Sequence, residues 1–263
     1  MRESGVLMHI TSLPGKYGVG TMGANAYAFV DFLKEAGQSY WQILPLTPTG
    51  YGDSPYQSSS TFAGNPYLID LEQLVRDGLL RTEELEGIQW NWSEEKTDYG
   101  LLYQNRSKVL RLAYERFADG EALDAFCHEN SSWLSDYALF MALKGATGGQ
   151  AWYTWEDGLK YRNPDVMWNT RQALREDIRF YSFVQFIFYK QWNALRAYAH
   201  DKGIRFIGDV PIYVPLDSCD VWSNPELFQL NPDLSPVDVA GCPPMRSPRT
   251  ASFGATPCTA GRI

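Results

Sequence analysis

The sequence predicts an α/β fold with parallel strands and an inserted block of helices. Short apolar runs at 6–10 and 41–46 flank a helical pattern at 24–36, which together make one βα unit. A third apolar run at 204–207 follows a long, mostly apolar helical pattern at 172–200. A run so short and so apolar as the third is typical of a strand buried on both faces, as in parallel sheets.

Composition narrows the possible functions. The chain has 263 residues, 44% of them hydrophobic, which suffices for one large domain or two small ones. The net charge of −8, without a basic block, argues against nucleic acid or an anionic membrane as partner. The four cysteines form no CxxC pair and have no histidine at ligand spacing, so we expect free thiols and no metal site. No signal peptide and no bilayer-spanning run is recognisable, so we expect a soluble, cytoplasmic protein.

The loop after the first strand contains Gly18-x-Gly20-x-x-Gly23, the spacing of the dinucleotide-binding fingerprint. That fingerprint requires an acidic residue about 20 positions further on, to hold a ribose hydroxyl. The second strand ends instead at Pro45 and Leu46, without an acid. The glycines are better interpreted as places where the loop runs close to a ligand or to neighbouring backbone, and no cofactor is expected.

The loop at 47–71 is the most informative part of the chain. It is long and irregular and it follows a strand of the predicted parallel sheet, a position where ordered loops are usually functional. Its first part mixes aromatic faces with neutral hydrogen-bonding groups: Tyr51, Ser54, Tyr56 and Gln57. Neutral sugars are recognised by such a mix, because they offer nothing ionic to grip and their CH faces stack on aromatic rings. A purely structural loop is the alternative explanation.

From residue 71 to about 168 the pattern changes to helices, with apolar residues three and four apart. We interpret this block as a helical subdomain inserted into the βα alternation. The predicted division of the chain has four parts: two βα units and the substrate loop at 1–70, the helical insert at 71–170, a helix with the third strand and its loop at 171–244, and a tail at 245–263.

Two polar side chains belong to the predicted strands. Asp209 comes at the end of the run at 204–207, where a carboxylate is a candidate for a site in β/α proteins, or caps the following turn. His9 lies inside the first strand, where a hydrogen-bonded core histidine is the default interpretation.

Several motifs resemble the 4-α-glucanotransferases called amylomaltases or disproportionating enzymes, relatives of the α-amylase clan. GDVPIYV, DSCDVW, NPELFQL and VAGCPP occur in this order at 208–244, and GYGDSPYQ occurs at 50–57. The resemblance implies a (β/α)8 TIM barrel with the helical insert after its second strand. It also implies retaining transglycosylation of α-1,4-glucans such as maltooligosaccharides, with no metal or organic cofactor.

The same resemblance implies roles for individual residues. Asp209 matches a position that hydrogen-bonds the sugar in the catalytic subsite without being the nucleophile, and an H-x-T-S-L-P pattern places His9 near the sugar. Three further positions border the donor sugars: Ser54, Tyr56 and Gln57. An aromatic residue matching Tyr51 belongs to a second glucan site on the surface.

The family's nucleophile Asp, its acid Glu and a third essential Asp have no match in this sequence. The resemblance covers Met1 to Pro244, roughly the first half of the family's length, so we expect no catalytic residue in the chain. Two hypotheses follow. The chain is either an inactive fragment of a 4-α-glucanotransferase or a non-catalytic carbohydrate-binding protein.

The tail at 245–263 differs from the rest, with three arginines, no acid and no periodicity. It begins where the family continues with GQLWGNPLY. If the last base of each codon is read with the first two bases of the next, permitted third bases allow the tail to be recovered as DAFAADGQLWGNPLYRWKD. We therefore expect a reading-frame shift near Pro244, a non-native sequence after it, and catalytic carboxylates encoded downstream in the other frame.

Overall fold

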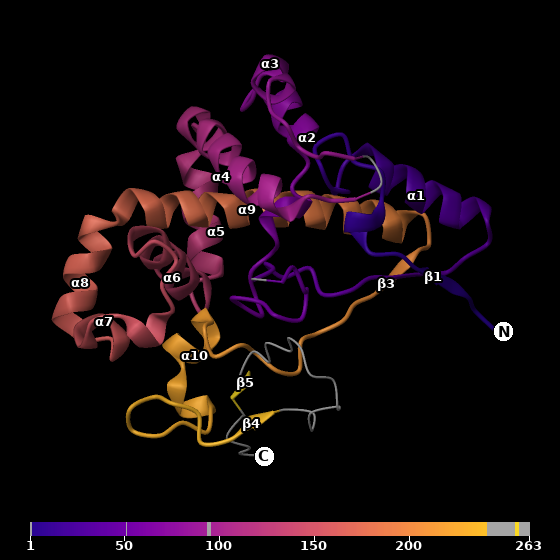
Figure 1. Ribbon diagram of the computed structural model, residues 1–263. Helices are drawn as coiled ribbons and strands as arrows, with labels where there is room; N and C mark the ends of the chain where they lie inside the picture. Colours follow the sequence, from indigo (N-terminus) through magenta and orange to yellow (C-terminus); the bar gives the residue numbers. More distant parts are fainter. Residues whose placement is uncertain (1, 51, 94–95, 241–255, 258–263) are drawn as a thin grey trace. The chain divides into compact units, whose positions relative to one another are not determined.

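The computed structural model describes residues 2–50, 52–93, 96–240 and 256–257 (Figure 1). The chain divides into two compact units, each built from three segments. The first, which we call the sheet unit, comprises Met1–Leu46, Gly64–Ser131 and Ser182–Asp209. The second, which we call the loop unit, comprises Thr47–Ala63, Ser132–Tyr181 and Val210–Ile263.

The sheet unit is built on three parallel strands, which pair in the order β1 (Gly5–Leu7), β2 (Tyr40–Gln42) and β3 (Arg205–Ile207). Val6, Trp41 and Phe206 lie opposite one another in the register. Trp41 is fully buried. Its ring lies 4.9 Å from that of Phe29, in helix α1 (Ala24–Glu35), and 5.0 Å from that of Phe206. This face of the sheet therefore packs against helices.

The opposite face of the sheet is open to solvent. Leu7, Gln42 and Ile207 lie opposite one another on it, and Leu7 and Ile207 are 57% and 42% exposed. The expectation that the strand at 204–207 is buried on both faces was therefore wrong. β3 has helical cover on one face only, and its first residue, Arg205, is exposed and pairs with Glu3 at 2.7 Å.

The first two strands are shorter than predicted. β1 ends at Leu7, although Met8 N still donates to Gln42 O at 3.0 Å, and the last residue of the predicted run begins a 3-10 helix, η1 (Ile10–Ser12). β2 ends at Gln42, after which Ile43 N donates to Ile207 O at 3.0 Å as the last rung of the ladder. Pro45 then ends the pairing because proline has no backbone N–H to donate.

The other elements of the sheet unit are helical: η2 (Pro66–Leu68), α2 (Leu71–Arg76), α3 (Thr82–Glu86), α4 (Tyr99–Arg116), α5 (Gly120–Glu129) and, from Ser182 onward, α9 (Arg175–Asp201). Three aspartates cap helix N-termini by accepting from a backbone N–H three residues on: Asp70 for α2, Asp98 for α4 and Asp119 for α5. Gly203, with φ +80°, follows the end of α9 and lets the chain turn into β3.

The described residues of the loop unit include the segment Thr47–Ala63, the start of α9 and the following helical elements: α6 (Leu134–Ala146), η3 (Trp152–Thr154), α7 (Asp157–Lys160), α8 (Pro164–Ala173), α10 (Cys219–Ser223) and η4 (Pro225–Leu227). Its core is aromatic, since the ring of Trp222 lies 5.8 Å from Phe140 and 5.6 Å from Trp155. Arg162 stacks 4.3 Å above Trp222. The guanidinium also pairs with Asp136 at 2.9 Å, which fixes the stack.

The helix predicted at 172–200 corresponds to α9, except that residues 172–173 belong to the end of a separate helix, α8. Asn163 caps α8 and Pro164 occupies its first turn, which sets the start of that helix. α8 ends at Ala173 and α9 begins at Arg175, with two acidic residues in its first turn.

The end of the chain is described only in part. β4 (Val239–Ala240) and β5 (Thr256–Pro257) pair antiparallel. Apart from Thr256–Pro257, the tail at 245–263 for which a frame shift is expected lies outside the described residues. Within the described ranges, no helix combines the length and apolar character needed to cross a bilayer.

Candidate substrate-binding site

His9 lies two residues beyond β1, in the sheet unit. Trp41 Nε1 donates to Met8 O at 2.7 Å and so fixes the backbone next to it. The imidazole is half-buried, and its Nδ1 is buried without a hydrogen-bond partner among the described residues. Burial lowers the pKa of His9 to about 4, so the ring is neutral at neutral pH. A neutral imidazole has one donor and one acceptor nitrogen, and here Nδ1 is the buried one, so it is not the nitrogen that a sugar hydroxyl would meet.

Asp209 lies two residues beyond β3, also in the sheet unit, and is exposed. β3 stays paired with β2 up to its last residue through the bond from Ile43 N to Ile207 O. Because β1, β2 and β3 are parallel, their carboxyl ends lie at the same edge of the sheet. The structure therefore places Asp209 and His9 at that edge, beyond the two outer strands.

The candidate sugar-contacting residues of the long loop belong to the loop unit, and the loop folds there into a tight turn. Gly50 N donates to Gln57 O at 2.9 Å, and Gln57 N donates to Ser54 O at 3.1 Å. Ser54 Oγ accepts from Tyr56 N at 3.3 Å. Asp53, at the tip, has φ 58°, a left-handed conformation that Asp tolerates in turns. The turn leaves Tyr56 and Gln57 exposed and Ser54 half-buried.

The base of this loop is held by α10, in the same unit. Thr61 N and Thr61 Oγ1 donate to the two carboxylate oxygens of Asp220, at 2.8 and 3.3 Å. Cys219 N donates to Ser59 O at 2.8 Å. Sequence reasoning missed Asp220. It shares the motif DSCDVW with Asp217, and nothing in the pattern shows that one carboxylate binds the loop while the other pairs with Lys144.

Of the six residues predicted to contact glucan, five are described. His9 and Asp209 lie in the sheet unit, and Ser54, Tyr56 and Gln57 lie in the loop unit. Tyr51 lies outside the described residues. The five offer a neutral imidazole, a carboxylate, a hydroxyl, a phenol and an amide, which are groups that bind hydroxyls. Within the described ranges, no three His, Cys, Asp or Glu side chains gather as metal ligands.

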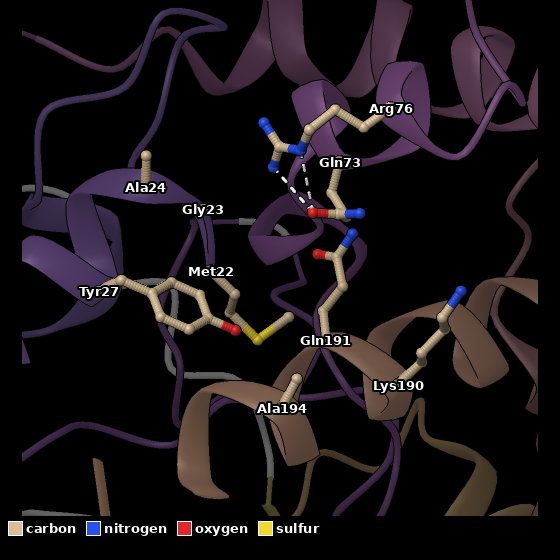
Figure 2. Close-up of a pocket in the computed structure, with 9 residues that line it drawn as sticks. All are labelled: Met22, Gly23, Ala24, Tyr27, Gln73, Arg76, Lys190, Gln191 and Ala194. Carbon is tan, nitrogen blue, oxygen red and sulfur yellow. Dashed lines mark hydrogen bonds between the residues drawn. The ribbon is translucent and has the colours of Figure 1, made fainter. Parts of the chain in front are cut away.

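A separate cavity of about 270 Å³ lies within the sheet unit. Figure 2 shows its lining, which comes from the start of α1, from α2 and from α9: Met22, Gly23, Ala24, Tyr27, Gln73, Arg76, Lys190, Gln191 and Ala194. None of the predicted site residues is among them. Its two cations are already engaged, because Arg76 donates twice to Gln73 Oε1 and Lys190 pairs with Asp77 at 3.1 Å.

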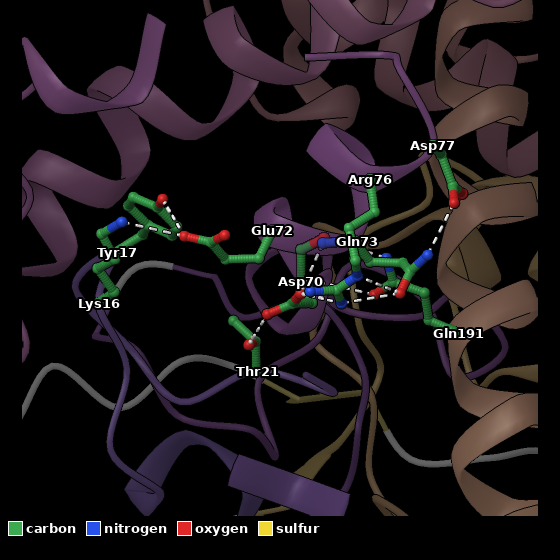
Figure 3. Close-up of polar contacts among 9 residues, drawn as sticks. All are labelled: Lys16, Tyr17, Thr21, Asp70, Glu72, Gln73, Arg76, Asp77 and Gln191. Atoms are coloured by element: carbon green, nitrogen blue, oxygen red, sulfur yellow. Dashed lines mark hydrogen bonds and ion pairs between the residues drawn. The ribbon is translucent and has the colours of Figure 1, made fainter. Parts of the chain in front are cut away.

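The polar network beside this cavity is centred on Asp70 (Figure 3). Its carboxylate caps α2 and accepts from Thr21 Oγ1 at 2.8 Å. The side-chain amide of Gln191, which is buried, accepts from Asp70 N at 2.7 Å and donates to Asp70 O at 3.1 Å. These bonds join α9 to the start of α2. The cavity is therefore bordered by groups that hold the helices together, and we assign it no ligand.

Comparison with known proteins gives one family. A family model described as 4-alpha-glucanotransferase matches residues 8–248. A 4-alpha-glucanotransferase from Clostridium butyricum is 47% identical over 253 residues, covering 95% of this chain and 52% of the relative. One from Thermus thermophilus is 49% identical over 249 residues, covering 92% of this chain and 49% of the relative. The chain thus spans about half the length of the relatives it matches.

Solved structures agree with this result. An amylomaltase from Streptococcus agalactiae in complex with acarbose superposes with a TM-score of 0.93 at 44% identity, covering 99% of this chain and 53% of the other. An amylomaltase from Corynebacterium glutamicum, with a TM-score of 0.68 and 20% identity, shares the fold. The predicted fold class, the amino-terminal part of a (β/α)8 barrel, is confirmed. Because the family model covers most of its length, the chain belongs to the 4-α-glucanotransferase family.

Proposed function

We propose that this chain is the amino-terminal half of a 4-α-glucanotransferase that acts on α-1,4-glucans, and that by itself it binds maltooligosaccharides without transferring glucosyl units. The observation that carries the proposal is the turn at the tip of the long loop. Its internal hydrogen bonds leave the ring of Tyr56 and the amide of Gln57 exposed side by side in sequence. A ring face and a neutral amide suit the CH face and the hydroxyls of a glucosyl unit.

The other candidate residues suit a glucan as well. We assign Asp209 the role of accepting hydrogen bonds from hydroxyls of the sugar in the catalytic subsite, since it is exposed beyond the end of β3. His9, neutral because of its burial, would contact the same sugar without adding charge. Ser54 borders the donor sugars together with Tyr56 and Gln57, and Tyr51 contributes to an outer glucan site.

Glucosyl transfer with retention requires a carboxylate nucleophile and a carboxylic acid about 5–5.5 Å apart. The chain has no match to the motifs that carry these groups in the family, and it spans about half the length of the relatives. We therefore expect binding without turnover. A chain of half the relatives' length is also compatible with the second candidate, a non-catalytic carbohydrate-binding protein. Glucosyl transfer by this chain joined to the remaining half of a relative would distinguish the two.

Calorimetric titration of the 263-residue chain with maltoheptaose tests the binding proposal. Substitution Tyr56→Ala removes a stacking ring worth about 1 kcal/mol, so we expect affinity to fall about fivefold. Tyr161→Ala is the matched control, because Tyr161 lies in the same unit outside the loop and is 48% exposed, against 44% for Tyr56. Equal affinities for the Tyr56→Ala variant and the unsubstituted chain, or no saturable binding at all, would refute the proposal.

A further inference from the structure

The segment Thr47–Ala63 has little secondary structure to hold its conformation. A single bridge joins Thr49 to Ser58, and the bond from Gly50 N to Gln57 O closes the tip. Beyond the bridge, Ser58 Oγ donates to Ser60 O at 2.6 Å, a contact internal to the loop. The position of the tip on the loop unit therefore depends on the contacts that the loop makes outside itself.

Asp220 supplies two of those contacts from one carboxylate. Its Oδ2 accepts from Thr61 N at 2.8 Å and its Oδ1 accepts from Thr61 Oγ1 at 3.3 Å. Hydrogen bonds to an ionised acceptor are stronger than bonds between neutral groups. The residues around it in α10 are packed, since Cys219, Val221 and Trp222 are all buried, so α10 is a firm base.

Loop conformation matters for the affinity of a sugar site. A loop that must be ordered when the ligand binds loses part of the contact energy to conformational entropy, whereas a loop that is already held keeps it. Thr61 is only four residues after Gln57 in the sequence, so fixing Thr61 restricts where the tip of the loop can lie.

We infer that Asp220 is a positioning residue for glucan binding, which holds Thr61 so that the loop presents Ser54, Tyr56 and Gln57 in one arrangement. This role rests on the proposed function of the loop. Asp220 does not touch the sugar. It acts through the backbone and side chain of Thr61.

The state of the Asp220 carboxyl gives the inference a pH signature. Burial raises the pKa of Asp220, and the two bonds from Thr61 offset this only in part. When the carboxyl is protonated, one oxygen becomes a donor and the two bonds to Thr61 no longer have two ionised acceptors. The affinity for glucan should therefore fall on acidification at a pH above the ordinary range of an aspartate.

Other titratable groups near Asp220 must be separated from this signature. The elements packed against α10 carry Asp136 and Lys144 in α6 and Glu226 in η4, and Arg162, just after α7, stacks on Trp222 of α10. The loop carries Asp53, and α10 itself carries Cys219, whose thiol pKa is raised by burial. A variant that replaces only the Asp220 carboxyl isolates its contribution, because all of these groups remain.

Three variants of the full chain test the inference with maltoheptaose. Asp220→Ala should lower affinity about tenfold and speed amide hydrogen exchange in the loop. Asp220→Asn keeps one acceptor for Thr61 N and gains a donor for Thr61 Oγ1. It should stay within about twofold of the unsubstituted chain at neutral pH and lose the fall on acidification. Asp217→Ala is the control. It removes a carboxylate that pairs with Lys144 and accepts from Trp152 N, and it should leave the affinity unchanged.

The outcomes separate this inference from the proposed function. The positioning role alone is overturned if Asp220→Ala leaves the affinity unchanged. It is also overturned if Asp220→Ala and Asp217→Ala both weaken binding in proportion to the stability that each loses. The same holds if the Asp220→Asn variant keeps the acid-induced fall of the unsubstituted chain. Absence of binding by the unsubstituted chain overturns the proposed function, and with it the role of Asp220 in binding.

Discussion

The half-buried imidazole of His9 should make the fold sensitive to acid. Its pKa is lowered by burial from 6.5 to about 4, so the folded chain keeps the ring neutral over a range in which the unfolded chain binds a proton. Stability is therefore complete above pH 6.5 and is lost as the pH falls toward 4. Each pH unit in this window costs about 1.4 kcal/mol, which gives about 2 kcal/mol between pH 6.5 and about pH 5.

Substitution His9→Gln removes this titration and keeps a neutral donor and acceptor. Urea unfolding, followed by tryptophan fluorescence at pH 6.5 and at about pH 5, measures the free energy of unfolding at each pH. We expect the variant to lose about 2 kcal/mol less than the unsubstituted chain on acidification, whatever the carboxylates contribute to both. His200→Gln, which removes an exposed histidine of α9, is the control and should follow the unsubstituted chain. An equal acid-induced loss with and without His9 would refute the reasoning.

Three other predictions follow from packing and charge. The double substitution Leu7→Thr and Ile207→Thr should reduce self-association in sedimentation velocity, because the open sheet face exposes both apolar side chains, and unchanged association would contradict this. Gly64→Ala should lower the free energy of unfolding by about 1–3 kcal/mol, since its Cβ would lie 2.1 Å from the ring of Phe188. Gly87→Ala, with no atom within 4 Å of the added Cβ, is the control, and equal melting temperatures would contradict the account. Affinity for maltoheptaose should change less than about twofold between low and high salt, because the ligand is neutral, and a collapse at high salt would disprove neutral recognition.

The sequence predicted the elements of the fold better than their limits. Apolar runs located the three strands of the sheet, because a strand with a buried face requires apolar residues whatever its exact first and last residues are. The ends were set by other factors. β1 ended at Leu7 and the last residue of the first predicted run, Ile10, began η1, while Pro45 ended the second strand. The open face of β3 could not be predicted either, since the apolar run does not record whether a partner covers it.

Residues of the candidate site differed in how far they could be read from the sequence. Tyr56 and Gln57 were predicted from the mix of aromatic and amide side chains in an irregular loop, and their contact with glucan stays a prediction. Asp220 escaped notice because its partner, Thr61, is far away in sequence, and a long-range hydrogen bond leaves no periodic pattern. The neutral state of His9 depends on burial by tertiary packing, which a strand pattern does not quantify.

Release of glucose from maltotriose tests the central claim most directly. Two proteins are compared: the 263-residue chain, and residues 1–244 joined to the corresponding remaining half of the Clostridium butyricum relative. If the chain is the glucan-binding half of a 4-α-glucanotransferase without catalytic carboxylates, the joined protein should release glucose and the chain alone should release none. Asp209→Ala in the joined protein should lower that activity. Turnover by the 263-residue chain itself would contradict the account, as would a folded joined protein that binds maltoheptaose and transfers nothing.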